Sequence, residues 1–120
     1  MARIVVVDDE ELVAESFAAA LRFAGHEVSV AHDGAEGLRL VTESLPEVVV
    51  SDITMPAMDG VAMTAALKAQ PATTHIPVLL ISGNVQPEKD ACDAFLTKPV
   101  NVREMLAVVQ RLVEQRRGEN

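Results

Sequence analysis

VVVSDITMPAMDG, residues 48–60, is the stretch that decides the fold class of this chain. Its apolar opening does not alternate with polar residues, which is typical of a strand buried on both faces of a parallel sheet. The strand ends at Asp52, so this carboxylate is expected at the carboxyl edge of the sheet, where open α/β sheets bind ligands. The Met-Pro step at 55–56 then interrupts regular structure, and Asp59 is placed to begin a helix.

Strand and helix patterns alternate along the rest of the chain. Short apolar runs predict strands over residues 3–7, 76–81 and 94–97, and an alternating run predicts a half-covered edge strand over residues 27–31. Apolar residues at helical spacing predict helices over residues 11–24, 33–45, 60–69 and from 101 onward. The inner face of the last helix is expected to comprise Val102, Met105, Leu106, Val109, Leu112 and Val113. This alternation indicates a parallel sheet with right-handed crossover connections.

The ends of the predicted helices carry suitable residues. Gly25 tolerates a positive φ and is placed to end the first helix, while Asp33 and Asn101 can cap the second and the last. The basic end of the chain contains Arg111, Arg116 and Arg117. These cations suit the negative end of a helix dipole, and a linker to a further domain is the alternative interpretation.

Composition narrows the classes of function. The chain has 120 residues, enough for one domain with a sizeable core, and a net charge of −8. This acidity, with no Trp and no Tyr, argues against direct binding of nucleic acid. No apolar run approaches the roughly 20 residues that span a bilayer. The single cysteine, Cys92, excludes an internal disulfide, and the start of the chain does not resemble a signal peptide, so a cytoplasmic location is expected.

Four of the five predicted strands end in a functional group. Asp8-Asp9, Asp52, Ser82 and Lys98 follow the strands directly, and parallel strands place all these ends on one edge of the sheet. Three clustered carboxylates repel one another unless a cation lies between them. Oxygen ligands without His or Cys select a hard ion, and Mg²⁺ fits best.

The lysine and the hydroxyl on the same edge are redundant for metal binding alone. They suit an anionic ligand with several oxygens, namely a phosphoryl group. Asp52 is then the natural nucleophile, because carboxylates can form acyl phosphates. The simpler interpretations are that Asp8 or Asp9 only caps the first helix and that Lys98 is a surface residue.

The joint pattern of DDE at 8–10, SDITMPAMDG at 51–60, LLISG at 79–83 and AFLTKP at 94–99 closely resembles the receiver domain of two-component response regulators. The resemblance covers nearly the whole chain, with the motifs in the order of the family. It implies a receiver domain over residues 1–120 with a flavodoxin-like (βα)5 fold. This fold is an α/β three-layer sandwich with a parallel sheet in the order 2-1-3-4-5.

The resemblance also implies roles for the residues that match the motifs. Asp52 corresponds to the phosphoacceptor, which receives the phosphoryl group from a histidine kinase or a phosphotransfer protein. The implied Mg²⁺ ligands are Asp8, Asp9, Asp52 and the backbone carbonyl of Thr54. Lys98, held by a cis peptide bond to Pro99, corresponds to the phosphate-binding lysine. Ser82 and Phe95 correspond to the switch residues, and a core side chain is the alternative role for Phe95.

Two other functions use similar residues. An aspartyl-phosphate phosphohydrolase of the haloacid dehalogenase type has a second aspartate two positions after the nucleophile, and Thr54 stands there instead. Turnover of external substrates is therefore not expected. A pseudo-receiver, which binds partners without phosphorylation, is the other alternative, but the acceptor site lacks none of its residues. The hydroxyl and amide side chains of Thr54 and Asn84, two beyond Asp52 and Ser82, are expected to influence phosphoryl lifetime.

The connection between the fourth and fifth strands departs from the family. Receivers usually have a full helix there, but only residues 88–94 can form one in this chain, and seven residues rise about 10 Å as a helix. Such a short helix is marginal and has no apolar stripe to pack. A shortened or missing fourth helix is therefore predicted, and phosphorylation is expected to order this loop through Ser82. The flank of the last strand and helix should then be less covered and is a candidate surface for a homodimer.

Overall fold

Five parallel strands form one sheet in the order β2-β1-β3-β4-β5 in the computed structural model, which describes residues 1–118. The strands are β1 (Arg3–Val7), β2 (Glu27–Ala31), β3 (Val48–Asp52), β4 (Val78–Ser82) and β5 (Ala94–Thr97). Every residue of β3 and β4 is buried, whereas the edge strands β2 and β5 are partly exposed. The structure confirms the predicted order 2-1-3-4-5.

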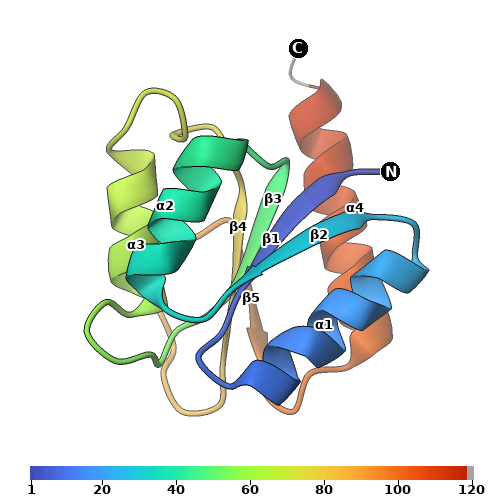
Figure 1. The fold of residues 1–120 in the computed structure, drawn as a ribbon, viewed down its shortest axis with the longest axis horizontal. Helices are drawn as coiled ribbons and strands as arrows, with labels where there is room; N and C mark the ends of the chain where they lie inside the picture. The colour runs from blue at the N-terminus through green and yellow to red at the C-terminus, as the bar shows by residue number, and fades with distance from the viewer. Residues whose placement is uncertain (119–120) are drawn as a thin grey trace.

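Helices cover both faces of the sheet (Figure 1). One face carries α1 (Glu11–Phe23) and α4 (Val102–Gly118), and the other carries α2 (Gly34–Ser44) and α3 (Gly60–Lys68). A hydrophobic core lies between the sheet and each pair of helices. This is the predicted α/β three-layer sandwich. Among residues 1–118, no helix is long and apolar enough to cross a membrane.

The helix ends follow the predicted capping residues. The side chains of Asp33, Asp59 and Asn101 each accept a hydrogen bond from the N–H group three residues later, at 2.7, 2.7 and 3.0 Å. These bonds satisfy N–H groups that have no partner within the helix. Gly25, with a φ of +98°, ends the turn after α1.

Three predicted details were wrong. The fourth strand begins at Val78 rather than at residue 76, because Pro77 has no N–H group and the N–H of Ile76 bonds to the carbonyl of Thr73. Leu45 is not part of the second helix but follows it with a φ of +48°. Val102 was expected on the inner face of the last helix, but this residue is 43% exposed in the first turn of that helix.

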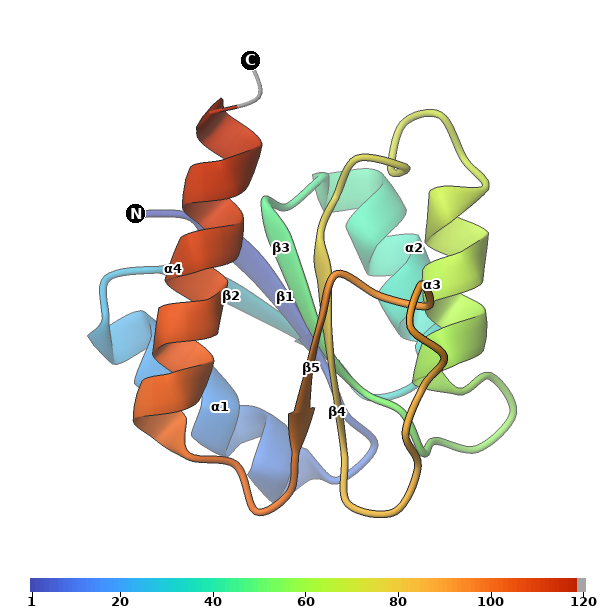
Figure 2. The ribbon, with the colours of Figure 1, turned by 180° about the vertical axis from the view of Figure 1, so that it is seen from behind.

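The connection from β4 to β5, residues 83–93, contains no helix (Figure 2). We call these eleven described residues the helix-free segment. Its last residue, Asp93, accepts hydrogen bonds from the N–H of Val78 at 2.8 Å and from Lys68 Nζ at 3.1 Å. Lys68 also donates to the carbonyl of Ile76 at 2.7 Å. The prediction of a missing fourth helix is therefore confirmed, and Asp93 and Lys68 together join this segment to α3.

The predicted effect on the last helix was wrong. The helix-free segment lies on the face of α2 and α3, where Cys92 and Phe95 pack against the core, whereas α4 packs on the opposite face with α1. Omitting a helix here does not uncover α4, whose residues Met105, Val109, Leu112 and Val113 are all buried. The element that loses cover is β5, none of whose residues is fully buried.

The basic end of α4 makes tertiary contacts at the amino edge of the sheet. Arg116 donates to the carbonyl of His75 at 2.7 Å. Arg117 forms two hydrogen bonds with the Glu47 carboxylate, at 2.8 and 2.9 Å, and donates to the carbonyl of Met1. These arginines therefore join the end of α4 to the sheet, in addition to lying at the negative end of the helix dipole.

Candidate functional site

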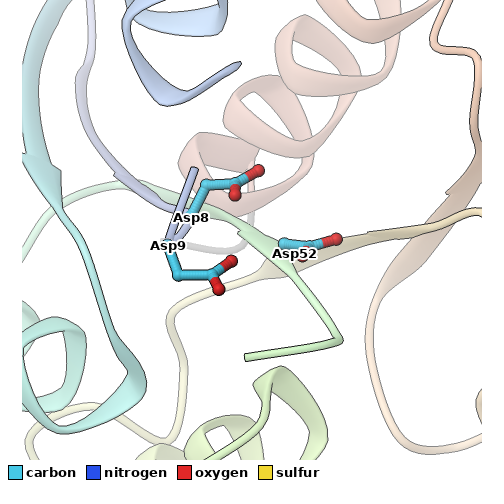
Figure 3. Close-up of side chains that lie close together, drawn as sticks. All are labelled: Asp8, Asp9 and Asp52. Atoms are coloured by element: carbon cyan, nitrogen blue, oxygen red, sulfur yellow. The ribbon is translucent and has the colours of Figure 1, made fainter. Parts of the chain in front are cut away.

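Three aspartates meet at the carboxyl edge of the sheet (Figure 3). Asp8 and Asp9 follow β1, and Asp52 is the last residue of neighbouring β3, where Val7 pairs with Ser51. One carboxylate oxygen of each residue lies within 4.8 Å of the others. Ionised carboxylates at that separation repel one another by about 3 kcal/mol per pair at an effective dielectric constant of 20. Parallel pairing of β1 and β3 thus creates the predicted acidic cluster.

Asp8 is the most deeply buried of the three carboxylates. One of its oxygens, Oδ1, accepts a hydrogen bond from the N–H of Glu10 at 2.9 Å. The other oxygen, Oδ2, is buried and has no hydrogen-bond partner among the described residues. Burial raises the pKa of Asp8 to about 6; the Glu10 N–H lowers it, and the charge of Asp52 raises it. A buried anionic oxygen without a donor is suited to a cation, so the residues present fit a metal ion.

Lys98 reaches the cluster from the end of β5. Its Nζ lies 3.2 Å from Asp52 Oδ1, and the following peptide bond to Pro99 is cis, as the family resemblance implied. Burial raises the pKa of Asp52, while the hydrogen bond and the positive charge of Lys98 lower it. Burial lowers the pKa of Lys98, but the hydrogen bond and charge of Asp52 outweigh that effect and raise it. Asp52 therefore lies between an acidic pair and an ammonium group.

A glycine allows α3 to pack directly against the strand that carries Asp52. A Cβ atom on Gly60 would lie 2.3 Å from the backbone carbonyl oxygen of Asp52, well inside contact distance. The N–H of Gly60 also donates to the carbonyl of Ile53 at 2.8 Å. The close packing at Gly60 thus positions the loop that follows Asp52. It also explains why glycine follows Asp59 in the motif, since a larger residue would clash with the strand.

Ser82 ends β4 beside Asp52 and holds the start of the helix-free segment. Its buried Oγ accepts hydrogen bonds from the N–H groups of Asn84 at 3.3 Å and Val85 at 3.0 Å, and donates to Asn84 Oδ1 at 3.3 Å. Its carbonyl accepts the N–H of Lys98 at 3.1 Å. Both the backbone and the side chain of Ser82 therefore connect the site to neighbouring segments.

Two predicted residues lie further out. Phe95 is half-buried against the core of the α3 face and lines a pocket of about 220 Å³ together with Ser82 and Asn84. This position is compatible with both the switch and the core interpretation. Thr54 lies in the loop after β3 with an exposed side chain, and its carbonyl as a metal ligand stays a prediction.

A groove of about 480 Å³ beside Lys98 was missed by the sequence interpretation. It lies between α1 and the start of α4, and its lining includes Leu12, Phe17 and Val102. Leu12 is 86% exposed. The sequence does contain an indication of this groove. Leu12 falls outside the apolar stripe of Val13, Phe17 and Leu21, which predicts a large apolar side chain on the solvent-facing side of the helix.

Comparison with known proteins gives the same family as the motifs. The family model described as response regulator receiver domain matches residues 4–110. The transcriptional regulatory protein PrrA of Mycobacterium leprae is 39% identical over 118 residues, which cover 95% of this chain and 51% of PrrA. The response regulator PleD of Caulobacter vibrioides is 38% identical over 117 residues, which cover 92% of this chain and 26% of PleD.

Solved structures resemble this fold closely. The signal receiver domain of a histidine kinase from Syntrophus aciditrophicus has a TM-score of 0.89 and 30% identity, over 96% of this chain and 92% of that one. The chemotaxis protein CheY4 of Vibrio cholerae has a TM-score of 0.85 and 30% identity, over 93% and 98%. The chain spans about half the length of PrrA. From the family match and the geometry of its strand ends, the chain belongs to the response regulator receiver domain family.

Proposed function

We propose that this receiver domain accepts a phosphoryl group on Asp52 from a histidine kinase or a histidine phosphotransfer protein. The observation that carries the proposal is the setting of the Asp52 carboxylate, which lies within 4.8 Å of two acidic groups and 3.2 Å from an ammonium group. Such a setting suits a nucleophile that becomes part of an acyl phosphate, because the surrounding charges can hold both a cation and a phosphoryl group.

The transfer is a single displacement at phosphorus. A carboxylate oxygen of Asp52 forms the new bond to phosphorus, and the bond to the donor nitrogen breaks with its electron pair. The phosphoimidazole of the donor carries a proton on its other ring nitrogen, so the leaving group is a neutral imidazole. Lys98 is close enough to Asp52 to hold a phosphoryl oxygen after transfer. Asp8, Asp9, Asp52 and the Thr54 carbonyl are the proposed Mg²⁺ ligands. Bound Mg²⁺ would offset the negative charge of the acids and the phosphoryl oxygens.

The groove beside Lys98 is the proposed surface for the phosphodonor. Leu12 and Val102 are exposed on its two sides, and Lys98 lies in its lining. A donor that covers these apolar side chains brings its histidine to the side of the site where Lys98 contacts Asp52. The donor then excludes water from the reacting groups.

The alternative functions have less support. Thr54 stands at the position of the second aspartate of a phosphohydrolase, so the chain lacks a general acid for external substrates. We propose that it is not an enzyme toward other molecules and promotes only its own phosphorylation and dephosphorylation. A pseudo-receiver remains the second candidate, but no observation favours it, since Asp8, Asp9, Asp52 and Lys98 lie together.

The remaining parts of the proposal concern location and assembly. We propose a cytoplasmic protein, because the kinases that phosphorylate receivers act there. The partly exposed strand β5 is the proposed surface for a homodimer. Sedimentation of the protein with Mg²⁺, with and without beryllofluoride, measures whether a phosphoryl mimic changes the mass of the assembly.

Treatment with acetyl phosphate and Mg²⁺ tests the acceptor. Intact-protein mass spectrometry should show the addition of one phosphoryl group to the parent, no addition with excess chelator, and none to Asp52→Ala. Asp90→Ala is the matched control, because it removes an exposed aspartate of the helix-free segment and should be labelled like the parent. Labelling of Asp52→Ala, or none of the parent, would overturn the proposal.

A further inference from the structure

The hydroxyl of Ser82 is fully engaged within its own loop. It donates its one proton to Asn84 Oδ1 at 3.3 Å, and it accepts the N–H groups of Asn84 and Val85. A serine hydroxyl offers one donor and two acceptor positions, so these three bonds use its whole capacity. Ser82 is 2% exposed, which limits exchange of these bonds for bonds to water.

This arrangement creates a competition for one proton. Ser82 follows Ile81 at the end of β4, and Ile81 accepts the N–H of Ile53, which directly follows Asp52. The hydroxyl therefore lies on the strand end next to the proposed phosphoacceptor. A phosphoryl group on Asp52 offers strong acceptor oxygens, but the proton of Ser82 cannot serve both the phosphoryl group and Asn84.

We propose that Asn84 is a positioning residue that holds the Ser82 proton in the unphosphorylated state and thereby opposes phosphoryl binding. The inference rests on the proposed function, since it concerns the response of the same site. Phosphorylation then breaks the hydrogen bond from Ser82 to Asn84 at the start of the helix-free segment. The other end of that segment stays fixed, because Asp93 is bonded to Val78 and Lys68.

Beryllofluoride with Mg²⁺ is a suitable probe, because it mimics the phosphoryl group without covalent transfer. Its affinity, measured by fluorine NMR titration, should rise roughly 2- to 10-fold in Asn84→Ala, which is the change expected for one neutral hydrogen bond lost from the free state. Affinity for Mg²⁺ alone should be the same as in the parent, because Ser82 and Asn84 are not among the proposed metal ligands.

A double-mutant cycle separates this role from a structural one. In the Ser82→Ala background the hydroxyl is absent, so Asn84→Ala should no longer change beryllofluoride affinity. Gln86→Ala is the matched control: Gln86 lines the same pocket, is exposed, and has no hydrogen bond to Ser82. It should bind like the parent.

The outcomes distinguish this inference from the proposed function. If Asn84→Ala binds beryllofluoride no more tightly than the parent does, the proposed role of Asn84 is overturned and the proposed acceptor site is unaffected. The same gain in the presence and absence of the Ser82 hydroxyl overturns it as well. A parent that binds no beryllofluoride in the presence of Mg²⁺ overturns the proposed function itself, and the inference with it.

Discussion

At the scale of single residues, the buried carboxylate of Asp8 opposes folding when no cation is bound. Its pKa is raised from 3.8 to about 6, chiefly by burial, so the folded chain holds a proton on Asp8 more tightly than the unfolded chain does. The stability that this proton supplies is complete below pH 4 and is lost as the pH rises through 6. Above that pH the ionised carboxylate lowers the free energy of unfolding.

The substitution Asp8→Asn should therefore stabilise the metal-free protein at neutral pH. The expected gain over the parent is up to about 3 kcal/mol at pH 7.5 and should shrink toward zero at pH 4. Urea denaturation with excess chelator at several pH values measures the difference. Excess Mg²⁺ should reduce or reverse the gain at pH 7.5, since the variant loses an anionic ligand. A gain that does not vary with pH would contradict the assignment to this carboxyl.

Ala57 gives a second prediction at this scale. It has a φ of +65° in the exposed loop after Asp52, a conformation that costs an L-residue roughly 1–2 kcal/mol. Ala57→Gly removes that cost and adds a smaller entropic one, so the free energy of unfolding should rise by about 0.5–1 kcal/mol. Ala72→Gly, at an exposed position without positive φ, is the control and should give no gain.

At the scale of elements, the helix-free segment shows how a parallel crossover is held without a helix. Its first residues bond to the Ser82 hydroxyl, and its last residue bonds to Val78 and Lys68. The N–H of Asp93 also donates to the carbonyl of Val78 at 3.0 Å, so the two residues form a reciprocal pair. Polar contacts at the two ends thus set the register of β5 on β4.

Loss of the Asp93 carboxylate should measurably destabilise the fold. Asp93→Ala leaves the N–H of Val78 without its partner, which is expected to lower the free energy of unfolding by about 1–2 kcal/mol. The ion pair with Lys68 adds little, because both side chains are about one-third exposed. Asp90→Ala, in the same segment, is the control and should denature at the urea concentration of the parent. Equal midpoints for Asp93→Ala would show that other contacts fix β5.

The elements and the grouping of the candidate site residues were predictable from the sequence for a shared physical reason. Parallel strands bring the residues that end or directly follow each strand to one edge of the sheet, so Asp8, Asp9, Asp52, Ser82 and Lys98 could be grouped before any distance was known. The missing helix was predictable because residues 88–94 offer too few apolar positions.

Other features depend on contacts that local patterns do not encode. The bond from Lys68 to Asp93, for example, joins residues 25 positions apart. The expectation about the flank of α4 was wrong although the topology already excluded it. Right-handed crossovers in the order 2-1-3-4-5 place the connections from β3 to β4 and from β4 to β5 on the same face of the sheet, that of α3. The hydrogen bond from the Ser82 hydroxyl to Asn84 likewise depends on the geometry of the turn. The sequence predicted roles for both residues but not this contact between them.

At the scale of the whole molecule, the two edges of the sheet have separate roles. The carboxyl edge gathers repelling acids, whereas the amino edge is stabilised by the contacts of Arg117 with Glu47 and Met1. An ion that binds only the folded state raises stability by mass action, by about 2.7 kcal/mol at a hundredfold excess over its Kd. The acidic edge is therefore where a ligand can change the stability of the entire domain.

Thermal unfolding with and without Mg²⁺ tests whether an ion bound at the acidic edge stabilises the whole domain. The parent should gain several degrees in Tm with Mg²⁺ in excess, and Asp9→Ala should lose most of the gain. Without metal, Asp9→Ala should be at least as stable as the parent, because one repelling charge is gone. Glu88→Ala, which removes an exposed acid far from the cluster along the chain, should keep the full gain. An unchanged response in Asp9→Ala would contradict the metal site.

The helix-free segment is also a position at which this fold should tolerate an inserted sequence. Between its two anchored ends, residues 86 and 88–90 are exposed, and Lys89 and Asp90 form a turn. A foreign sequence inserted between Lys89 and Asp90 interrupts no helix or strand, and lengthening a loop costs little closure entropy. An inserted domain should therefore fold without disturbing the acidic edge, so this receiver can serve as a host in which the guest lies one short stretch of chain from Ser82.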